Sequence, residues 1–271
     1  MPTLRWCLAG KEQYCCGVGS FESTNHLHHE DGAFQEYIYL DAGYLAILSD
    51  DLEPVLAAPV LCAGLPACKA VKNASLSPGH FLVVIGAGGS LGQYAVQYGL
   101  AHDACVIGVN TGAPKEALVS SLDAAYFVDY KRTPNPVSHI QTLTDSGAHA
   151  VIVTAGLTSA FAAAASLLRT EGTMCCIGIP PGGGPILTSV AGIVIKEPKI
   201  QRNLVGGLRE CMAALALVKH AAGKPKVYVR PFMDVPKVYE ELDQGHIAGR
   251  VVLKVGEDAG ADLALRKGNE L

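Results

Sequence analysis

The sequence has no run of basic residues, and its net charge is −4. Proteins that bind nucleic acid or anionic membranes through electrostatic attraction gather lysine and arginine into clusters. The charge pattern therefore argues against nucleic acid and anionic membranes as partners.

The sequence also has no apolar stretch near its start. The first residues, MPTLRWCLAGKEQYCC, contain no segment of the length that a signal peptide needs. The longest uncharged apolar segment, Val151–Leu168, is interrupted by Gly156 and by hydroxyl side chains, so a strand followed by a helix describes it better than a membrane span. The nine cysteines are an odd number without regular spacing, which favours reduced thiols over a disulfide framework. We expect a cytoplasmic protein without a membrane anchor.

From residue 81 onward, short apolar runs alternate with helix-like segments. The predicted strands are Phe81–Ile85, Cys105–Val109, Tyr126–Asp129, Ala150–Thr154, Met174–Gly178 and a weaker run, Ile200–Val205. The predicted helices are Ser90–Ala101, Pro114–Leu122, Pro136–Leu143, Ser159–Arg169, Thr188–Ile195 and Gly207–Ala222. Strands that are apolar on both faces and alternate with helices predict an α/β fold with a parallel sheet covered on both sides. Six such strands match a doubly wound Rossmann sheet.

The two ends of the chain have a different pattern. A strand-like aromatic segment, Phe34–Leu40, lies near the start, and a short helix, Pro236–Leu242, precedes a final strand, Arg250–Val255. We expect these flanks to form a smaller second domain beside the sheet. The predicted division is 1–60 for its N-terminal part, 61–224 for the dinucleotide-binding domain and 225–271 for the returning C-terminal segment, with a frayed tail after 256.

A glycine-dense turn follows the first predicted strand. Gly86, Gly88, Gly89 and Gly92 open a helix, which begins with Ser90 and Leu91. Glycine permits a tight turn and lets backbone N–H groups approach a pyrophosphate, next to the positive end of the helix. The spacing departs from G-x-G-x-x-G because Leu91 occupies the third glycine position, although Gly86, Gly89 and Gly92 also read as G-x-x-G-x-x-G. The turn predicts dinucleotide binding; a purely structural turn in a flavodoxin-like sheet is the alternative.

The end of the second predicted strand bears on the choice of cofactor. A carboxylate there accepts from the ribose hydroxyls of NAD, whereas a basic residue favours the phosphate of NADP. Here the residue is Asn110, with Lys115 on the next helix. Asparagine can bind a hydroxyl without repelling a phosphate. The choice between NAD and NADP stays open, with a slight preference for NAD.

Six stretches together resemble the zinc-containing alcohol dehydrogenases of the medium-chain dehydrogenase/reductase family, most of all the yeast and fungal type. They are DGAFQEYIYLDA, APVLCAG, GHFLVVIGAGGSLGQYAVQYGLA, SGAHAVIV, EGTMCCIGIPPG and GHIAGRVVLKV. The resemblance implies a Rossmann domain that binds the nicotinamide cofactor, and a partial, mainly β, GroES-like catalytic domain built from both chain ends. It implies hydride transfer between NAD(P) and an alcohol, aldehyde or ketone, with a catalytic zinc that polarises the substrate oxygen.

Positions that match the family's motifs identify candidate site residues. Cys62 matches the third protein ligand of the catalytic zinc. Asn110 replaces the ribose-binding aspartate, and Ile177 and Ile179 lie where the end of a strand flanks the nicotinamide. Arg250 matches an arginine that approaches the cofactor phosphates, although a plain surface salt bridge is an alternative for it.

The resemblance fails at the zinc ligands. A catalytic zinc needs three protein ligands, and the family's first cysteine and its histidine precede the part that this sequence resembles. We therefore expect an N-terminally truncated catalytic domain. Of the four cysteines of the family's structural zinc site, only Cys15 has a match, with Glu12 and Ser23 at positions where cysteines are expected. Two further interpretations concern the cysteines and histidines. Cys62 would be a small buried side chain, and an improvised metal site would use His26, His28 and His29 with Cys7, Cys15 and Cys16.

Three functions remain open from the sequence. The first is an oxidoreductase of the alcohol dehydrogenase type, whose activity the missing ligands place in doubt. The second is a zinc-independent reductase of enones or quinones, and the third is a non-catalytic nucleotide-binding protein. Neither the substrate nor the oligomeric state, a homo-oligomer included, is determined by the sequence.

Overall fold

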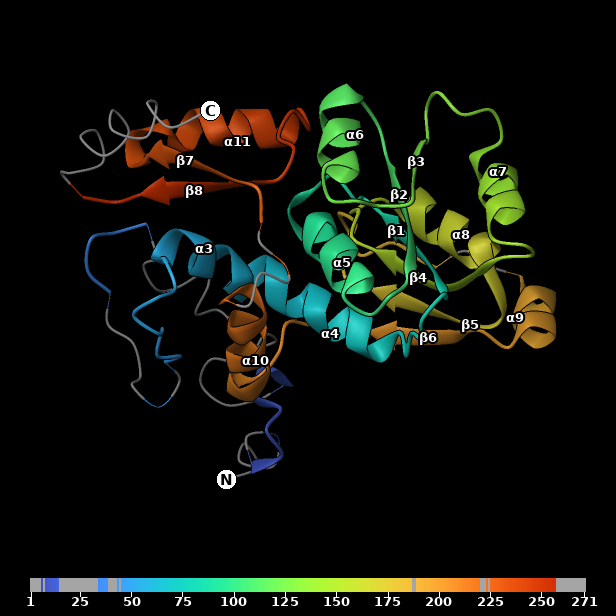
Figure 1. Ribbon diagram of the computed structural model, residues 1–271, viewed down its shortest axis with the longest axis horizontal. Helices are drawn as coiled ribbons and strands as arrows, with labels where there is room; N and C mark the ends of the chain where they lie inside the picture. The colour runs from blue at the N-terminus through green and yellow to red at the C-terminus, as the bar shows by residue number, and fades with distance from the viewer. Residues whose placement is uncertain are drawn as a thin grey trace.

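The protein consists of a large α/β unit and a smaller unit beside it (Figure 1). The computed structural model describes residues 6, 8–14, 34–38, 43, 45–186, 189–219, 223 and 225–256. Two sheets are present among them, one of six strands and one of two.

The six-stranded sheet forms the centre of the large unit. Its strand order is β3-β2-β1-β4-β5-β6, and every neighbouring pair is parallel. The strands are β1 (Phe81–Ile85), β2 (Cys105–Asn110), β3 (Tyr126–Asp129), β4 (Ala148–Val153), β5 (Leu168–Cys176) and β6 (Lys199–Arg202). This is the doubly wound order of dinucleotide-binding sheets, so the predicted fold class is confirmed.

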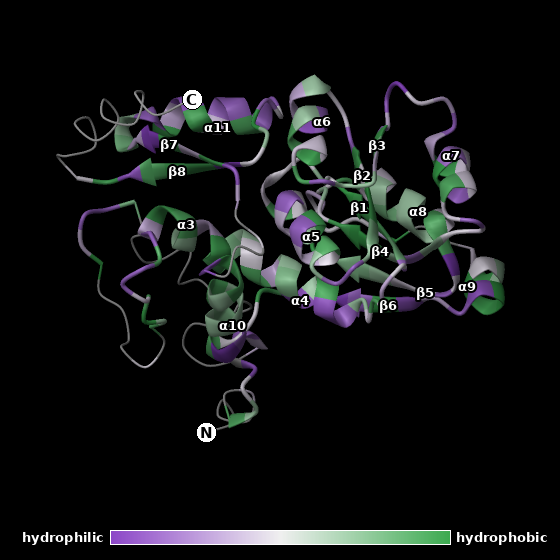
Figure 2. Cartoon of the chain, in the orientation of Figure 1, coloured by the Kyte–Doolittle hydropathy of each residue, from purple (hydrophilic) through white to green (hydrophobic). Residues whose placement is uncertain are grey.

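Alternate residues of each strand enter different cores. On β1, Leu82 and Val84 belong to one buried cluster, whereas Val83 and Ile85 belong to the cluster on the other face. The first cluster is completed mainly by α4 (Leu65–Asn73), α5 (Ser90–Leu100) and α10 (Leu208–Lys219). The second is completed by α7 (Pro136–Leu143) and α8 (Thr158–Leu167). Helix α6 (Ala113–Ser120) adds Val119 to the first cluster, whereas α9 (Val190–Lys196) has no buried residue and lies at the outer end of the sheet (Figure 1). Figure 2 shows the central strands in the colours of apolar residues, as a sheet covered on both faces requires.

One long helix joins the two units. It starts as α3 (Pro54–Pro59), passes through one π-helical turn, η3 (Val60–Gly64), and continues as α4. By length and composition alone this helix could cross a membrane, but 56% of its apolar window is buried inside the protein. It packs against α5 and α10, which identifies it as a core helix. The predicted domain boundary at residue 60 falls inside it and stays a prediction.

The smaller unit contains a second, two-stranded sheet. Strands β7 (Val227–Pro231) and β8 (Arg250–Lys254) are parallel and are connected by the short 3₁₀ turn η4 (Phe232–Asp234) and by α11 (Val235–Asp243). The expected strand Phe34–Leu40 is wrong over its described part, because Phe34–Ile38 pairs with no described strand. Phe34 instead contacts the ring of Phe232, with ring centroids 6.0 Å apart.

The bounds predicted from the sequence are exact for β1, β3 and α7 and least accurate for β5 and β6. Strand β5 starts at Leu168 and ends at Cys176, so the expected strand Met174–Gly178 lies too late in the sequence at both ends. The pairing of β5 with β4 is irregular. The weak run Ile200–Val205 forms a shorter strand, β6, which begins one residue earlier. Asn203 N donates to Cys176 O just beyond it, where the chain leaves the sheet.

Candidate functional site

The candidate site lies at the carboxyl ends of the central strands. From β1 the chain proceeds outward through β2 to β3, and it then returns to the other side of β1 to form β4, β5 and β6. Where the direction reverses, the loops after β1 and β4 lead to opposite faces and leave a crevice. The residues after β1, β2, β4 and β5 therefore converge at one edge of the sheet.

The glycine turn after β1 is crowded by backbone atoms at two of its glycines. Gly86 has φ +94°, and a Cβ there would lie 2.5 Å from Thr154 Oγ1. A Cβ on Gly92 would lie 2.1 Å from Gly86 O and 2.6 Å from Ala87 Cα. Gly86 therefore makes the tight turn, and Gly92 lets α5 pack directly against it.

Gly89 differs from these two because an added Cβ there would be much less crowded. It has an extended backbone, with φ −90° and ψ 178°, and the only atom near an added Cβ would be Gly86 O at 3.3 Å. Gly89 is the N-cap of α5, and no side chain caps this helix. The first-turn N–H groups of Ser90, Leu91 and Gly92 are thus available to an anion at the positive end of the helix dipole.

The C-terminal segment docks on this same turn. Gly249 N donates to Gly88 O at 3.1 Å, and Arg250 Nη1 donates to Ser90 Oγ at 3.2 Å. Nearby, Lys226 N donates to Gln93 Oε1 at 2.7 Å, which satisfies an amide that is fully buried in α5. These bonds place the guanidinium of Arg250 beside the open N-terminus of α5.

Asn110 lies at the end of β2, next to the turn. Its Oδ1 accepts from Thr111 N at 2.8 Å, so the N–H groups of its amide are the donors that it can offer to a ligand. The loop that follows is held by Asp129, at the end of β3, which accepts from Gly112 N at 3.1 Å and from Arg132 Nε at 2.8 Å. The Gly112 N–H, followed by the guanidinium of Arg132, lowers the pKa of Asp129 to about 2.

Asp129 was missed by reasoning from the sequence. It supports Asn110 indirectly, by fixing Gly112 in a left-handed conformation with φ +92°. A carboxylate at the end of the strand next to β2 is a signal that could have identified it, since strand ends meet at one edge of a parallel sheet.

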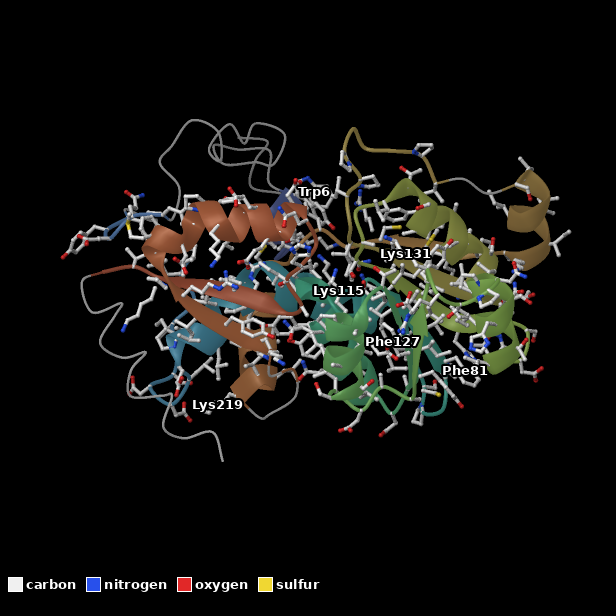
Figure 3. The ribbon with its side chains drawn as sticks, turned by 90° about the horizontal axis from the view of Figure 1, so that it is seen from above. Trp6, Phe81, Lys115, Phe127, Lys131 and Lys219 are labelled. Atoms are coloured by element: carbon white, nitrogen blue, oxygen red, sulfur yellow. The ribbon has the colours of Figure 1, made fainter. Side chains whose placement is uncertain are left out.

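Lys115 lies on α6 and closes the other side of the turn. A Cβ on Gly88 would lie 2.5 Å from Lys115 Cβ, so the two backbones are in close contact. Burial lowers the pKa of the Lys115 ammonium. In Figure 3, Lys115 lies where the sheet unit meets the smaller unit.

An apolar slot of about 150 Å³ opens beside Asn110. Its polar rim includes Thr111, Tyr130 and Ser159, and its walls come from the ends of β1 and β2 and from α7 and α8. Ile177 and Ile179 follow β5 at the same edge of the sheet. Ile177 N donates to Val153 O at 3.0 Å, and the side chain of Ile179 is 68% exposed.

Cys62 lies in the π-helical turn η3, which packs against α5. Its side chain is exposed, so the interpretation of Cys62 as a small buried residue is wrong. Within the described part of the chain, no group of three His, Cys, Asp or Glu side chains could hold a metal ion. Among the described residues, Cys62 therefore has no second or third metal ligand beside it. Glu12 begins the short helix η1 (Glu12–Tyr14). The other residues considered as metal ligands, Cys7, Cys15, Cys16, Ser23, His26, His28 and His29, lie outside the described residues.

Comparisons with known proteins agree with this geometry. The family model for zinc-binding dehydrogenases matches residues 90–220. An alcohol dehydrogenase of Schizosaccharomyces pombe is 32% identical over 252 residues, which cover 93% of this chain and 70% of that protein. The crystal structure of the alcohol dehydrogenase from Aeropyrum pernix superposes with a TM-score of 0.81 at 25% identity, covering 92% of this chain and 72% of that one. Acetophenone reductase from Geotrichum candidum, solved in complex with NAD, shares the fold with a TM-score of 0.77 at 21% identity, covering 93% and 70% of the two chains.

Proposed function

The chain belongs to the zinc-containing alcohol dehydrogenase family, and we propose that it binds a nicotinamide dinucleotide at the glycine turn and acts as an oxidoreductase on a small alcohol, aldehyde or ketone. The observation that carries this proposal is the uncapped N-terminus of α5, with Arg250 bonded to its first residue. The positive end of the α5 dipole and the guanidinium of Arg250 both border a space that no described side chain fills.

The pyrophosphate of the dinucleotide would occupy this space. Backbone N–H groups at Ser90, Leu91 and Gly92 donate to its oxygens, and Gly89 permits close approach because it has no side chain. Arg250 then acts as a second donor, since Ser90 Oγ occupies only one of the N–H groups of its guanidinium.

The adenosine half would extend toward β2. The slot beside Asn110 is apolar, which suits an adenine ring. Val137 and Ile140 form one of its walls and Ala160 another. The Asn110 amide donates to a ribose hydroxyl and repels neither a hydroxyl nor a phosphate. With Lys115 close by, the site accommodates both NAD and NADP; because Asn110 takes the place of a ribose-binding group, NAD is slightly preferred.

The nicotinamide half would lie beyond β5. The bound cofactor supplies the hydride chemistry, and the protein supplies orientation. Ile177 and Ile179 form the strand end against which the ring would rest, and the exposed Ile179 side chain would shield one ring face from water.

The described residues do not fit a catalytic zinc. Three protein ligands are required, and Cys62 has no partner donors within the described ranges. We further propose that the protein acts in the cytoplasm on small molecules. A homo-oligomer is compatible with this function.

Titration of the protein with NADH and NADPH, followed by cofactor fluorescence, tests the binding site. We expect saturable binding by the wild type and its loss in Gly89→Asp, because a carboxylate would stand against the pyrophosphate. Gly89→Ala is the matched control: it adds a methyl group in the same direction without charge, and its loss of affinity should be smaller. The melting temperatures of both variants should stay near that of the wild type, since an added Cβ would meet a single atom, Gly86 O, at 3.3 Å.

A folded wild-type protein without affinity for either dinucleotide would contradict the proposal. Activity is then measured with NAD and ethanol, with NADH and a ketone, and with NADPH and an enone or a quinone. Turnover of the enone or quinone alone would select the zinc-independent reductase, and binding without any turnover would select a nucleotide-binding protein.

A further inference from the structure

A second cavity, of about 600 Å³, lies on the far side of the long helix from the glycine turn. Its walls come from the N-terminal segment 8–14, from α4, from the edge strand β6 and from the start of α10. Figure 1 shows the N-terminal segment beside α10, below α4. The glycine turn and the apolar slot share no residue with this cavity.

The cavity gathers positive charge in a protein that is negative overall. The described residues that line it include five cations and one carboxylate, Glu210, an excess of four positive charges, whereas the whole chain has a net charge of −4. The five cations are Lys11, Lys69, Lys72, Arg202 and Arg209. No two of them are adjacent in the sequence, so only the fold brings them together.

Two of the cations are held in place by an aromatic ring. Lys69 Nζ lies 5.4 Å from the centre of the Tyr14 ring, and the guanidinium carbon of Arg202 lies 5.1 Å from it. Lys69 is only 11% exposed and is 3.6 Å from Glu210 Oε2, so the one carboxylate is already engaged. Like charges that share one ring repel each other, and this repulsion is relieved when an anion enters.

The remaining cations face the cavity without a counter-ion. Lys72 and Arg209 make no ion pair with a described carboxylate, and both side chains are exposed. They extend from two different helices, α4 and α10, toward the same space. A ligand with charge at more than one point could therefore contact both.

From this geometry we propose that the cavity binds a small molecule that carries two or more phosphate groups. Ammonium and guanidinium groups are the usual partners of phosphate. An excess of four positive charges matches a di- or triphosphate better than a single carboxylate or phosphate. A concave site of this size encloses a small molecule, whereas a nucleic acid would need an extended basic surface.

The sole tryptophan of the chain provides a reporter for this site. Trp6 contacts the edge of the Tyr14 ring, with centroids 5.7 Å apart, and is labelled in Figure 3. Binding beside Tyr14 should change the emission of Trp6. We would titrate the protein with sodium tripolyphosphate, follow Trp6 fluorescence, and confirm the stoichiometry by calorimetry.

We expect one tripolyphosphate per chain, with an affinity that falls as salt is added because the contacts are charged. Lys72→Glu and Arg209→Glu should each weaken binding at least tenfold. Lys237→Glu, an exposed lysine on α11, makes the same charge change away from the cavity and should leave the affinity within twofold. Gly89→Asp should also leave it unchanged, which separates this site from the dinucleotide site.

Orthophosphate and adenosine triphosphate are the comparison ligands. Orthophosphate should bind at least tenfold more weakly than tripolyphosphate. Equal affinities for tripolyphosphate and adenosine triphosphate would assign recognition to the phosphates alone, and tighter nucleotide binding would add a base contact; both outcomes support the site. No binding to the folded wild type, binding abolished by Gly89→Asp, or equal weakening by Lys237→Glu and Arg209→Glu would each overturn the proposal.

Discussion

Replacing Gly92 by alanine places a methyl group against backbone that has no room for it. The new Cβ would lie 2.1 Å from Gly86 O, 2.6 Å from Ala87 Cα and 2.7 Å from Ala87 C. Contacts under 3.0 Å cannot persist, and here the obstacle is the glycine turn itself. Either α5 moves away from β1 or the turn opens, and both changes disturb the proposed phosphate site.

The expected cost follows from overpacking in a close-packed region. Such insertions typically destabilise by about 1–3 kcal/mol, and three backbone contacts place Gly92→Ala at the upper end of that range. For a protein of this size the melting temperature should fall by about 5 °C. Gly89→Ala provides the control within the same loop, because its Cβ meets a single atom at 3.3 Å. Its stability should stay within about 0.5 kcal/mol of the wild type, since reduced freedom of the unfolded chain offsets the poorer N-cap.

Thermal unfolding by circular dichroism measures both variants, and NADH titration adds a functional measurement. Gly92→Ala should lower both stability and affinity, whereas Gly89→Ala should lower affinity alone. If Gly92→Ala is as stable as the wild type, or if Gly89→Ala is the less stable of the two, the close approach of α5 to the turn is wrong.

Three further predictions concern other groups. Asn110→Asp should shift the NAD:NADP affinity ratio toward NAD by about tenfold, because a carboxylate repels the 2′-phosphate; an unchanged ratio in dinucleotide titrations would place Asn110 away from the ribose. Burial, followed by the charges of His80 and Arg169, lowers the pKa of His149 from 6.5 to about 4. As the pH falls, the unfolded chain therefore binds a proton at His149 at a higher pH than the folded protein does. The free energy of unfolding should therefore decrease between pH 6.5 and 4 by about 1–2 kcal/mol after allowance for solvent screening, and the decrease should be smaller in His149→Gln when denaturant unfolding is compared across this range. Cys62 has no described co-ligand, so metal analysis of the purified protein should find less than one zinc per chain and little ethanol oxidation. A stoichiometric zinc that Cys62→Ser removes together with activity would show that other residues complete the site.

The β1–α5–β2 segment could be predicted almost residue by residue. Phe81–Ile85 was predicted with its exact bounds, and Ser90–Leu100 and Cys105–Asn110 each differ by one residue at one end. The reason is local: apolar runs, a glycine turn and helix-forming residues all indicate the same structure. β5 could not be predicted as well, because its first half contains Arg169, Thr170 and Glu171, whose exposed polar side chains interrupt the apolar pattern. The pairing with β4 is also interrupted there, between Leu168 and Thr173.

The long helix from Pro54 to Asn73 was missed for an identifiable reason. Pro59 and Pro66 both indicate breaks, since proline has no N–H to donate within a helix. The structure accommodates them through the π-helical turn Val60–Gly64, which changes the hydrogen-bond pattern between the two prolines. Burial of this helix against α5 and α10 compensates for the weaker local preference.

The site itself was only partly accessible from the sequence. The roles of the glycines follow from their spacing after a strand, but Asp129 and the bonds from Gln93 to Lys226 depend on tertiary contacts. The basic cavity is the clearest case. Its cations are spread from Lys11 to Arg209, so a search for basic runs finds none of it.

The docking of β8 on the glycine turn has a consequence for how the protein matures during synthesis. Arg250 and Ser90 are 160 residues apart, and Gln93 and Lys226 are 133 apart. The Rossmann strands can pair while the chain is still being made, because domains fold as their residues emerge. The guanidinium and the backbone that complete the turn emerge only with the last strand. A nascent chain therefore has the sheet before it has the finished phosphate site, and Arg250 can add to nucleotide binding only after translation has passed residue 250.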